Sequence, residues 1–196
     1  ILIHGYRGNH HGLEAIAGAL NDFNVVIPDL PGFGESTPFE AEHTVERYSQ
    51  WLGQFISALE LTKPPHLLGH SFGSIVTACH AATASDITTL SLINPVSAPA
   101  LKGPRQALTR LTQVFYWSTA TLPARLGLAL LKSPVVVRGM SIVMAKTKLR
   151  DLRRWIHLQH DQNFSSFAER RVATEGFTAS ISHNVGEYAS AIAVPG

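Results

Sequence analysis

The stretch GHSFG at residues 69–73 constrains the fold of this chain more than any other feature of the sequence. It fits the pattern G-x-S-x-G, in which a serine occupies a sharp turn between a β-strand and an α-helix. Glycines two residues before and two residues after the serine let the strand and the helix approach each other without a clash between side chains. The pattern therefore predicts that the hydroxyl of Ser71 is presented at a strand–turn–helix junction.

The residues on either side of this stretch favour the same junction. Pro64 and Pro65 break the chain before the short apolar run 66–68, and residues 72–84 are rich in Ala, Val, Ile and Thr. Such runs predict a buried strand followed by a buried helix. The apolar spacing of residues 44–61 predicts a second helix that packs against the sheet. A plain turn without chemistry remains the alternative interpretation of the pentapeptide.

Two more strands are predicted upstream. Residues 1–5 resemble the end of a buried strand that runs into a loop at 6–9, and residues 24–28 form another short apolar run. The loop can supply a backbone N–H to an oxyanion, and the N–H of Phe72 at a helix N-terminus can supply a second. We interpret Asp29 as the side-chain cap of a tight turn rather than as a catalytic acid.

Three motifs carry a family resemblance: HGYRG at 4–8, DLPGFGES at 29–36 and GHSFGS at 69–74. In this order and spacing they resemble the serine-dependent esterase and lipase branch of the α/β-hydrolase superfamily. The resemblance covers residues 1–97 closely and is weaker afterwards. It implies an α/β fold with a doubly wound, mostly parallel sheet and a helical cap inserted over the site. It also implies a triad of serine, histidine and an acid, with Ser71 as the nucleophile.

The resemblance also implies a substrate site. The backbone N–H groups of Tyr6 and Phe72 would hold the oxyanion, and His4, Gly5 and His70 would line the site. The implied reaction is hydrolysis of a carboxylic ester or thioester with a hydrophobic acyl or alkyl group, through an acyl-enzyme. An amidase or carbon–carbon hydrolase of the same fold, and a non-catalytic binding scaffold, stay open as alternatives.

The acid and histidine of such a triad are not found at matching positions. The sequence starts at Ile1 inside a predicted strand and ends at residues 191–196, where the family approaches the strand before the acid. Asn94 occupies a position after a strand where some hydrolases carry an acid, and it cannot hold the charge. We therefore expect a piece of a longer enzyme, cut at both ends and nearly inert alone. A shortened protein that has lost its chemistry is the alternative.

None of the histidines present matches the missing base. His70 directly precedes Ser71 on a strand, so alternation should point its side chain to the opposite face. We interpret His4 as a structural hydrogen-bonding partner rather than a base. His183 lies at no position where the family keeps its histidine.

A second set of polar residues lies on one face of a predicted helix. His157, His160 and Asp161 share that face, and such residue types can ligate a metal. Because no further ligand cluster accompanies them, we interpret them as a solvated helix face. We predict neither a metal nor a cofactor. The single cysteine, Cys79, excludes an internal disulfide within this sequence.

Charge divides the chain into parts. Residues 98–154 carry eleven Lys and Arg against Asp151 alone, whereas residues 1–97 carry three basic against nine acidic residues. The basic stretch is also apolar and begins where the family inserts its cap. Prolines 123 and 134 are expected to separate short amphipathic helices within it. We predict a hydrolase core at 1–97, a helical cap at 98–180 and a return to the core at 181–196.

The basic cap also bears on partners. No window of about twenty residues lacks an Arg, Lys or Pro, so we expect no transmembrane segment. The basic side of the cap is either solvated or meets an anionic surface, which would be lipid headgroups or an acidic acyl carrier. Nucleic acid is not expected, because the aromatic run 115–117 is typical of a core. We expect a cytoplasmic or peripherally membrane-bound protein, although a signal peptide before Ile1 would lie outside this sequence.

Overall fold

A parallel β-sheet forms the centre of the fold in the computed structural model, which describes residues 1–101 and 106–195. Residues 102–105 of the predicted cap and Gly196 of the predicted return lie outside the described residues. The described sheet has three strands in the order β1 (Leu2–Ile3), β2 (His66–His70) and β3 (Thr89–Ile93). The carboxyl ends of all three strands therefore lie at the same edge of the sheet, where ligands bind in open α/β folds.

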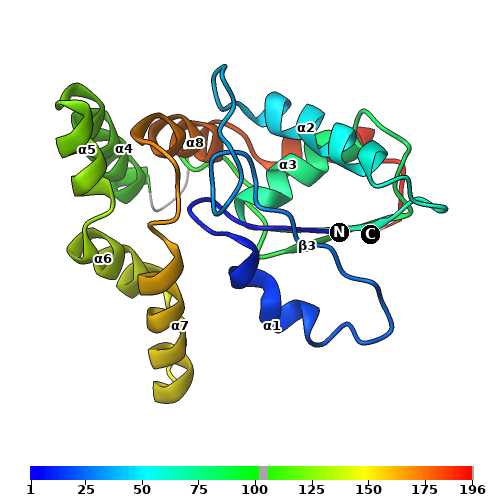
Figure 1. Cartoon of the computed structure of the whole chain (residues 1–196), viewed down its shortest axis with the longest axis horizontal. Helices are drawn as coiled ribbons and strands as arrows, with labels where there is room; N and C mark the ends of the chain where they lie inside the picture. Colours follow the sequence, from blue (N-terminus) through cyan, green and yellow to red (C-terminus); the bar gives the residue numbers. More distant parts are fainter. Residues whose placement is uncertain (102–105, 196) are drawn as a thin grey trace.

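Helices cover both faces of this sheet. Figure 1 shows α1 (Glu14–Ala17) on one side and α2 (Val45–Ala58) with α3 (Phe72–Ala81) on the other. The predicted α/β fold with helices on both faces is thereby confirmed. All residues of α3 are buried, whereas α2 buries one apolar stripe. The side chain of Thr44 starts α2 by accepting a hydrogen bond from the Arg47 N–H at 3.3 Å.

The strand predicted at residues 24–28 is not formed. The N–H of Leu2 donates to the carbonyl of Val26 at 2.9 Å, which keeps this extended segment beside β1. A single hydrogen bond is not sufficient for a β-ladder, and Pro28 has no N–H that could donate a further one. The prediction was wrong because apolar character alone does not show whether backbone partners are in reach.

Five helices occupy most of the predicted cap. They are α4 (Gln106–Thr121), α5 (Ala124–Leu131), α6 (Pro134–Met144), α7 (Arg150–Asn163) and α8 (Arg170–Ser182). In Figure 1, α4 to α7 gather at one side of the sheet and α8 bridges toward α3. Pro123 precedes α5 and Pro134 is the first residue of α6, which confirms the predicted breaks. No single helix in the described ranges is long and apolar enough to cross a membrane, but α5 and α6, bent by 41°, pass that test as a pair.

The chain returns to the sheet after α8. The N–H of Val185 donates to the carbonyl of Val96 at 2.8 Å, and the N–H of Leu90 in β3 donates to the carbonyl of Pro195 at 3.0 Å. The end of the described chain therefore runs beside β3. The division into a core, a cap and a return to the core stays a prediction.

Candidate active site

Ser71 lies between β2 and α3, at the junction that its sequence pattern predicts. Its φ of 54° and ψ of −117° fall in a region that residues other than glycine rarely adopt. Its N–H donates to the carbonyl of Ile93 in β3 at 3.1 Å, which ties the turn to the neighbouring strand. Backbone strain of this kind costs on the order of 1–3 kcal/mol and concentrates at functional sites.

The glycines of the motif allow the strand and the helix to meet. A Cβ on Gly69 would lie 2.3 Å from the Oγ1 of Thr77, and a Cβ on Gly73 would lie 2.3 Å from the carbonyl oxygen of Ile3. Both distances are far below van der Waals contact. Any larger residue would push α3 away from β1 and β2, and the serine would move with it.

A second serine holds the turn in place. The hydroxyl of Ser74 donates to the carbonyl of Ser71 at 2.5 Å and accepts from the N–H of Val96 at 3.2 Å. Ser74 is fully buried, so these bonds replace the water that its hydroxyl would otherwise bind. Ser74 was not singled out from the sequence, where its signal was a small polar residue in the first turn of a mostly apolar helix.

The loop after β1 passes directly beside this turn. The N–H of Gly8 donates to the carbonyl of Gly5 at 3.0 Å, which closes a tight turn with Arg7 at a φ of 61°. A Cβ on Gly5 would lie 3.0 Å from the Cβ of Ser71. The backbone at Gly5 is therefore a direct neighbour of Ser71.

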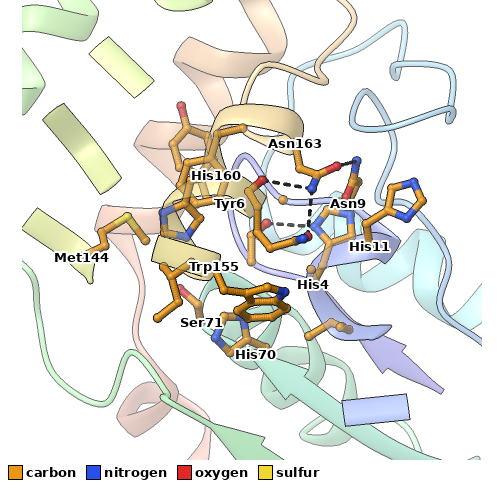
Figure 2. A pocket seen from close by; sticks show the side chains of 17 residues that line it. His4, Tyr6, Asn9, His11, His70, Ser71, Met144, Trp155, His160 and Asn163 are labelled. Atoms are coloured by element: carbon orange, nitrogen blue, oxygen red, sulfur yellow. Dashed lines mark hydrogen bonds between the residues drawn. The ribbon is translucent and has the colours of Figure 1, made fainter. Parts of the chain in front are cut away.

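A cavity of about 150 Å³ opens above Ser71. It lies between the core and the cap, and Figure 2 shows side chains from both parts pointing into it. The core contributes His4, Gly5, Tyr6, His70 and Ser71 to its lining, and the cap contributes Met144, Trp155, Ile156, Gln159, His160, Asn163 and Phe164. Of these cap residues, only His160 is named from the sequence, as part of a solvated helix face, and the others have no local signal beyond helical spacing.

His70 also lines this cavity, although strand alternation predicts that it faces away from Ser71. A Cβ on Gly5 would lie 3.4 Å from the Nδ1 of His70 and 3.0 Å from the Cβ of Ser71. The expected orientation was wrong because the positive φ of Ser71 ends the alternation at that residue. Burial lowers the pKa of His70, so its ring is neutral at pH 7.

His4 is a structural residue in this site. Its Nδ1 donates to the carbonyl of Gly5 at 2.8 Å, and its Nε2 accepts from the N–H of Leu30 at 2.9 Å. Burial lowers the pKa of His4 to about 4, the Gly5 carbonyl and Asp29 oppose this, and His10 and His70 add to it. With both nitrogens engaged, His4 fixes the loop rather than accepting a proton, as interpreted from the sequence.

The histidines of α7 converge on a buried serine of α6. The Nδ1 atoms of His157 and His160 lie 2.5 and 2.8 Å from the Oγ of Ser141, and Asp161 forms a salt bridge with Arg138. The prediction of a solvated helix face was wrong for the two histidines, which are partly buried against α6 because α7 packs on it, whereas Asp161 is exposed. Burial lowers the pKa of His160, the neighbouring His157 adds to this, and Asp161 opposes it.

Asp29 closes the turn for which the sequence suggested it. Its carboxylate accepts hydrogen bonds from the N–H of Glu35 at 2.9 Å and from the N–H of His10 at 2.7 Å. Burial alone would raise the pKa of this carboxyl, but the bonds from Glu35 and His10 outweigh burial and lower it. Asp29 is not among the residues that line the cavity.

Three further histidines make contacts of their own, and one of them, His11, lines the cavity above Ser71. His183 hydrogen-bonds Glu187 at 2.9 Å and does not line the cavity. His10 and His11, with Glu14, place possible ligand atoms within 4.8 Å of one another. Because the His11 and Glu14 side chains are about half exposed and already hydrogen-bonded to each other, we assign no metal to them.

The strained serine between a parallel strand and a buried helix, under a helical cap, defines an α/β hydrolase. The model of the Alpha/beta hydrolase family matches residues 1–183. The chain belongs to this family.

Two lipases are similar to this chain in sequence, and an esterase is similar to it in fold. The chain is 34% identical to Lipase 1 of Psychrobacter immobilis over 96 residues, which are 48% of this chain and 30% of that lipase. It is 34% identical to Lipase 3 of Moraxella sp. (strain TA144) over 83 residues, which are 42% of this chain and 26% of that one. The esterase EaEST from Exiguobacterium antarcticum superposes with a TM-score of 0.71 at 19% identity, over 98% of this chain and 69% of the esterase. The chain therefore matches less than a third of either curated lipase.

Proposed function

We propose that Ser71 is the nucleophile of an ester hydrolase. The observation that carries this proposal is the strained backbone of Ser71 at the floor of a cavity roofed by the cap. The Ser71 Oγ attacks the ester carbonyl carbon while a histidine takes its proton, and the same histidine then protonates the departing alcohol. Water attacks the acyl-enzyme in the second half of the reaction and releases the acid. The proposal assigns the base to the histidine that the family keeps after its last strand, beyond residue 196.

Two backbone amides are proposed to hold the oxyanion. Phe72 is the first residue of α3, so its N–H is free of the helix ladder and lies at the positive end of the helix dipole. Tyr6 lies in the loop that passes beside Ser71, and its side chain is anchored by a 2.6 Å hydrogen bond to the Ala173 carbonyl. Anchoring the loop keeps its N–H groups in place before charge develops, which is how such donors lower the barrier.

The proposed substrate is an ester or thioester with a hydrophobic acyl group. At about 150 Å³ the cavity is smaller than most ligand pockets, which span roughly 300–1,000 Å³. Met144 lines this cavity and also an apolar groove of about 590 Å³ between α4 and α6. We propose that the acyl chain runs from Ser71 past Met144 into this groove.

Ester turnover tests the proposal. The protein to use is a chain extended past residue 196 by the segment that holds the acid and the histidine of the family. We expect Ser71→Ala to lower kcat for p-nitrophenyl esters by about a million-fold. The matched change Ser57→Ala, at an exposed position of α2, should leave kcat unchanged. Turnover by Ser71→Ala within tenfold of the wild type would instead favour a binding scaffold without this chemistry.

A further inference from the structure

The outer side of the cap exposes an unusual number of large apolar side chains. The most exposed of them are Val135 at 81%, Trp117 and Leu149 at 68%, Leu111 at 67% and Ile142 at 63%. Single exposed apolar residues are ordinary, but soluble proteins rarely gather this many on neighbouring elements. These residues come from α4, α6 and the start of α7, so this part of the surface is suited to contact something apolar.

One groove on this surface is almost entirely apolar. It lies between α4 and α6 and has a volume of about 590 Å³. Its walls include Leu111, Val114 and Phe115 from α4 and Met140 and Val143 from α6. Its apolar lining is suited to contact hydrocarbon chains.

A second groove, on the other side of α6, is basic. It has a volume of about 340 Å³ and is lined by Arg138, Arg150, Arg153 and Arg154, with His157 and Leu158. Arg138 is paired with Asp161, while Arg150, Arg153 and Arg154 form no salt bridge within residues 1–101 and 106–195. Arg153 donates from its Nε to the Thr147 carbonyl at 2.8 Å, and its Nη2 donates to the same oxygen. Its remaining N–H groups and those of Arg150 and Arg154 surround one hollow and are suited to bind phosphate.

Helix α6 joins these two grooves. Figure 1 shows it between α4 and α7, and its side chains contribute to both hollows. Its exposed face carries Val135, Arg138 and Ile142 at positions i, i+3 and i+7, so apolar and basic side chains share one face. A helix that presents both kinds of side chain together is typical of the membrane–water interface.

We infer that the face formed by α6 and its two flanking grooves binds an anionic lipid surface. The arginines of the basic groove contact lipid phosphates, and the apolar side chains enter the boundary between headgroups and acyl chains. An acidic acyl carrier would satisfy the arginines but would leave Val135 and Ile142 in water. An anionic lipid surface contacts both the arginines and the exposed apolar side chains. It is therefore the partner that the charge and the apolar exposure favour together.

This inference shares the apolar groove with the route proposed for the acyl chain, but it does not depend on the chemistry at Ser71. None of the residues named for lipid contact lines the cavity above Ser71. Vesicle binding therefore succeeds or fails separately from ester hydrolysis, and the chain of 196 residues can be used as it is.

The test is co-sedimentation with vesicles of phosphatidylcholine alone or mixed with phosphatidylglycerol. We expect at least tenfold tighter binding to the anionic vesicles at low salt, and weaker binding as salt rises. The double change Arg153→Gln with Arg154→Gln should weaken anionic binding by about twenty-five-fold, at roughly fivefold per basic residue. The control pair Arg47→Gln with Lys63→Gln removes the same charge from exposed positions outside the cap and should change binding by less than about twofold.

A second pair of variants tests the apolar contribution. Val135→Ser with Ile142→Ser alters two exposed side chains, so folding is not at risk, and it should weaken binding to both kinds of vesicle. Equal binding to neutral and anionic vesicles at low salt would overturn the inference. So would equal losses in the arginine pair and its control, or binding to an acidic acyl carrier protein with none to anionic vesicles. A stable dimer whose formation buries this face would overturn it as well.

Discussion

The Nε of Arg7 donates a hydrogen bond to the carbonyl of Phe164 at 3.0 Å, which joins the loop beside Ser71 to the end of α7. The same guanidinium donates to the Tyr116 hydroxyl at 3.1 Å and to the Leu131 carbonyl at 2.6 Å. Its plane also lies over the Phe167 ring, 4.9 Å from the centroid. Arg7 is fully buried, so one side chain of the core holds three separate segments of the cap.

Arg7→Met should destabilise the chain strongly. The change removes three hydrogen bonds from a charged donor and leaves buried carbonyls unpaired, which we expect to lower the free energy of unfolding by about 3 kcal/mol. Arg47→Met, at an exposed position of α2, should stay within about 0.5 kcal/mol of the wild type. Urea denaturation measures both variants, and similar losses in the two would contradict the role assigned to Arg7.

Gly69→Ala should also destabilise, through backbone crowding at the turn. Its new Cβ would lie 2.6 Å from the carbonyl oxygen of Gly73, so α3 has to move. We expect a loss of about 2 kcal/mol. Gly139→Ala is the matched control, because a Cβ at this position in the middle of α6 meets nothing within 4 Å. This change should raise the free energy of unfolding by about 0.5–1 kcal/mol. If both changes shift the urea midpoint in the same direction, the close packing at Gly69 is not what the turn requires.

Stability should fall as the pH drops from 7 to 5, with His4 as one cause. Burial lowers the pKa of His4 to about 4 in the folded chain, from an ordinary value of 6.5. Between these two values the unfolded chain binds the extra proton, so acidification favours unfolding by about 2 kcal/mol over this range. His4→Gln should remove that part of the pH dependence, whereas His66→Gln, at an exposed position, should keep it. The measurement is the free energy of unfolding at pH 7 and at pH 5. An equal decrease between the two pH values in His4→Gln and the wild type would contradict the role assigned to His4.

Met144→Trp should narrow the passage between the cavity at Ser71 and the apolar groove. Met144 lines both, so a larger ring there obstructs a long acyl chain but leaves room for a short one. In the extended chain we expect kcat/KM for decanoate esters to fall at least tenfold while that for acetate esters changes little. Ile142→Trp, on the exposed face of α6, serves as the control. Equal losses for both chain lengths would show that the acyl chain takes another route.

The turn at Ser71 could be predicted from the sequence because its causes are local. The glycines at 69 and 73, the prolines before β2 and the apolar run after Ser71 all lie within about twenty residues of one another. The helices at 44–61 and 72–84 were found for the same reason, since helical spacing is visible in a short window.

The roof of the site could not be predicted in this way. Trp155 and His160 reach the cavity only because α7 folds back over the loop after β1, and Arg7 finds its partners more than one hundred residues away. The position of His70 depended on one backbone angle at Ser71, which no residue pattern encodes. Contacts of this kind are set by the packing of distant segments rather than by local preference.

The central claim is that the hydroxyl of Ser71 is the nucleophile, and a covalent probe tests it most directly. A fluorophosphonate should react once per molecule with the chain extended past residue 196, and peptide mass spectrometry should place the adduct on Ser71. The Ser71→Ala variant should then carry no adduct. An adduct on another residue, or equal labelling of Ser71→Ala, would contradict the claim.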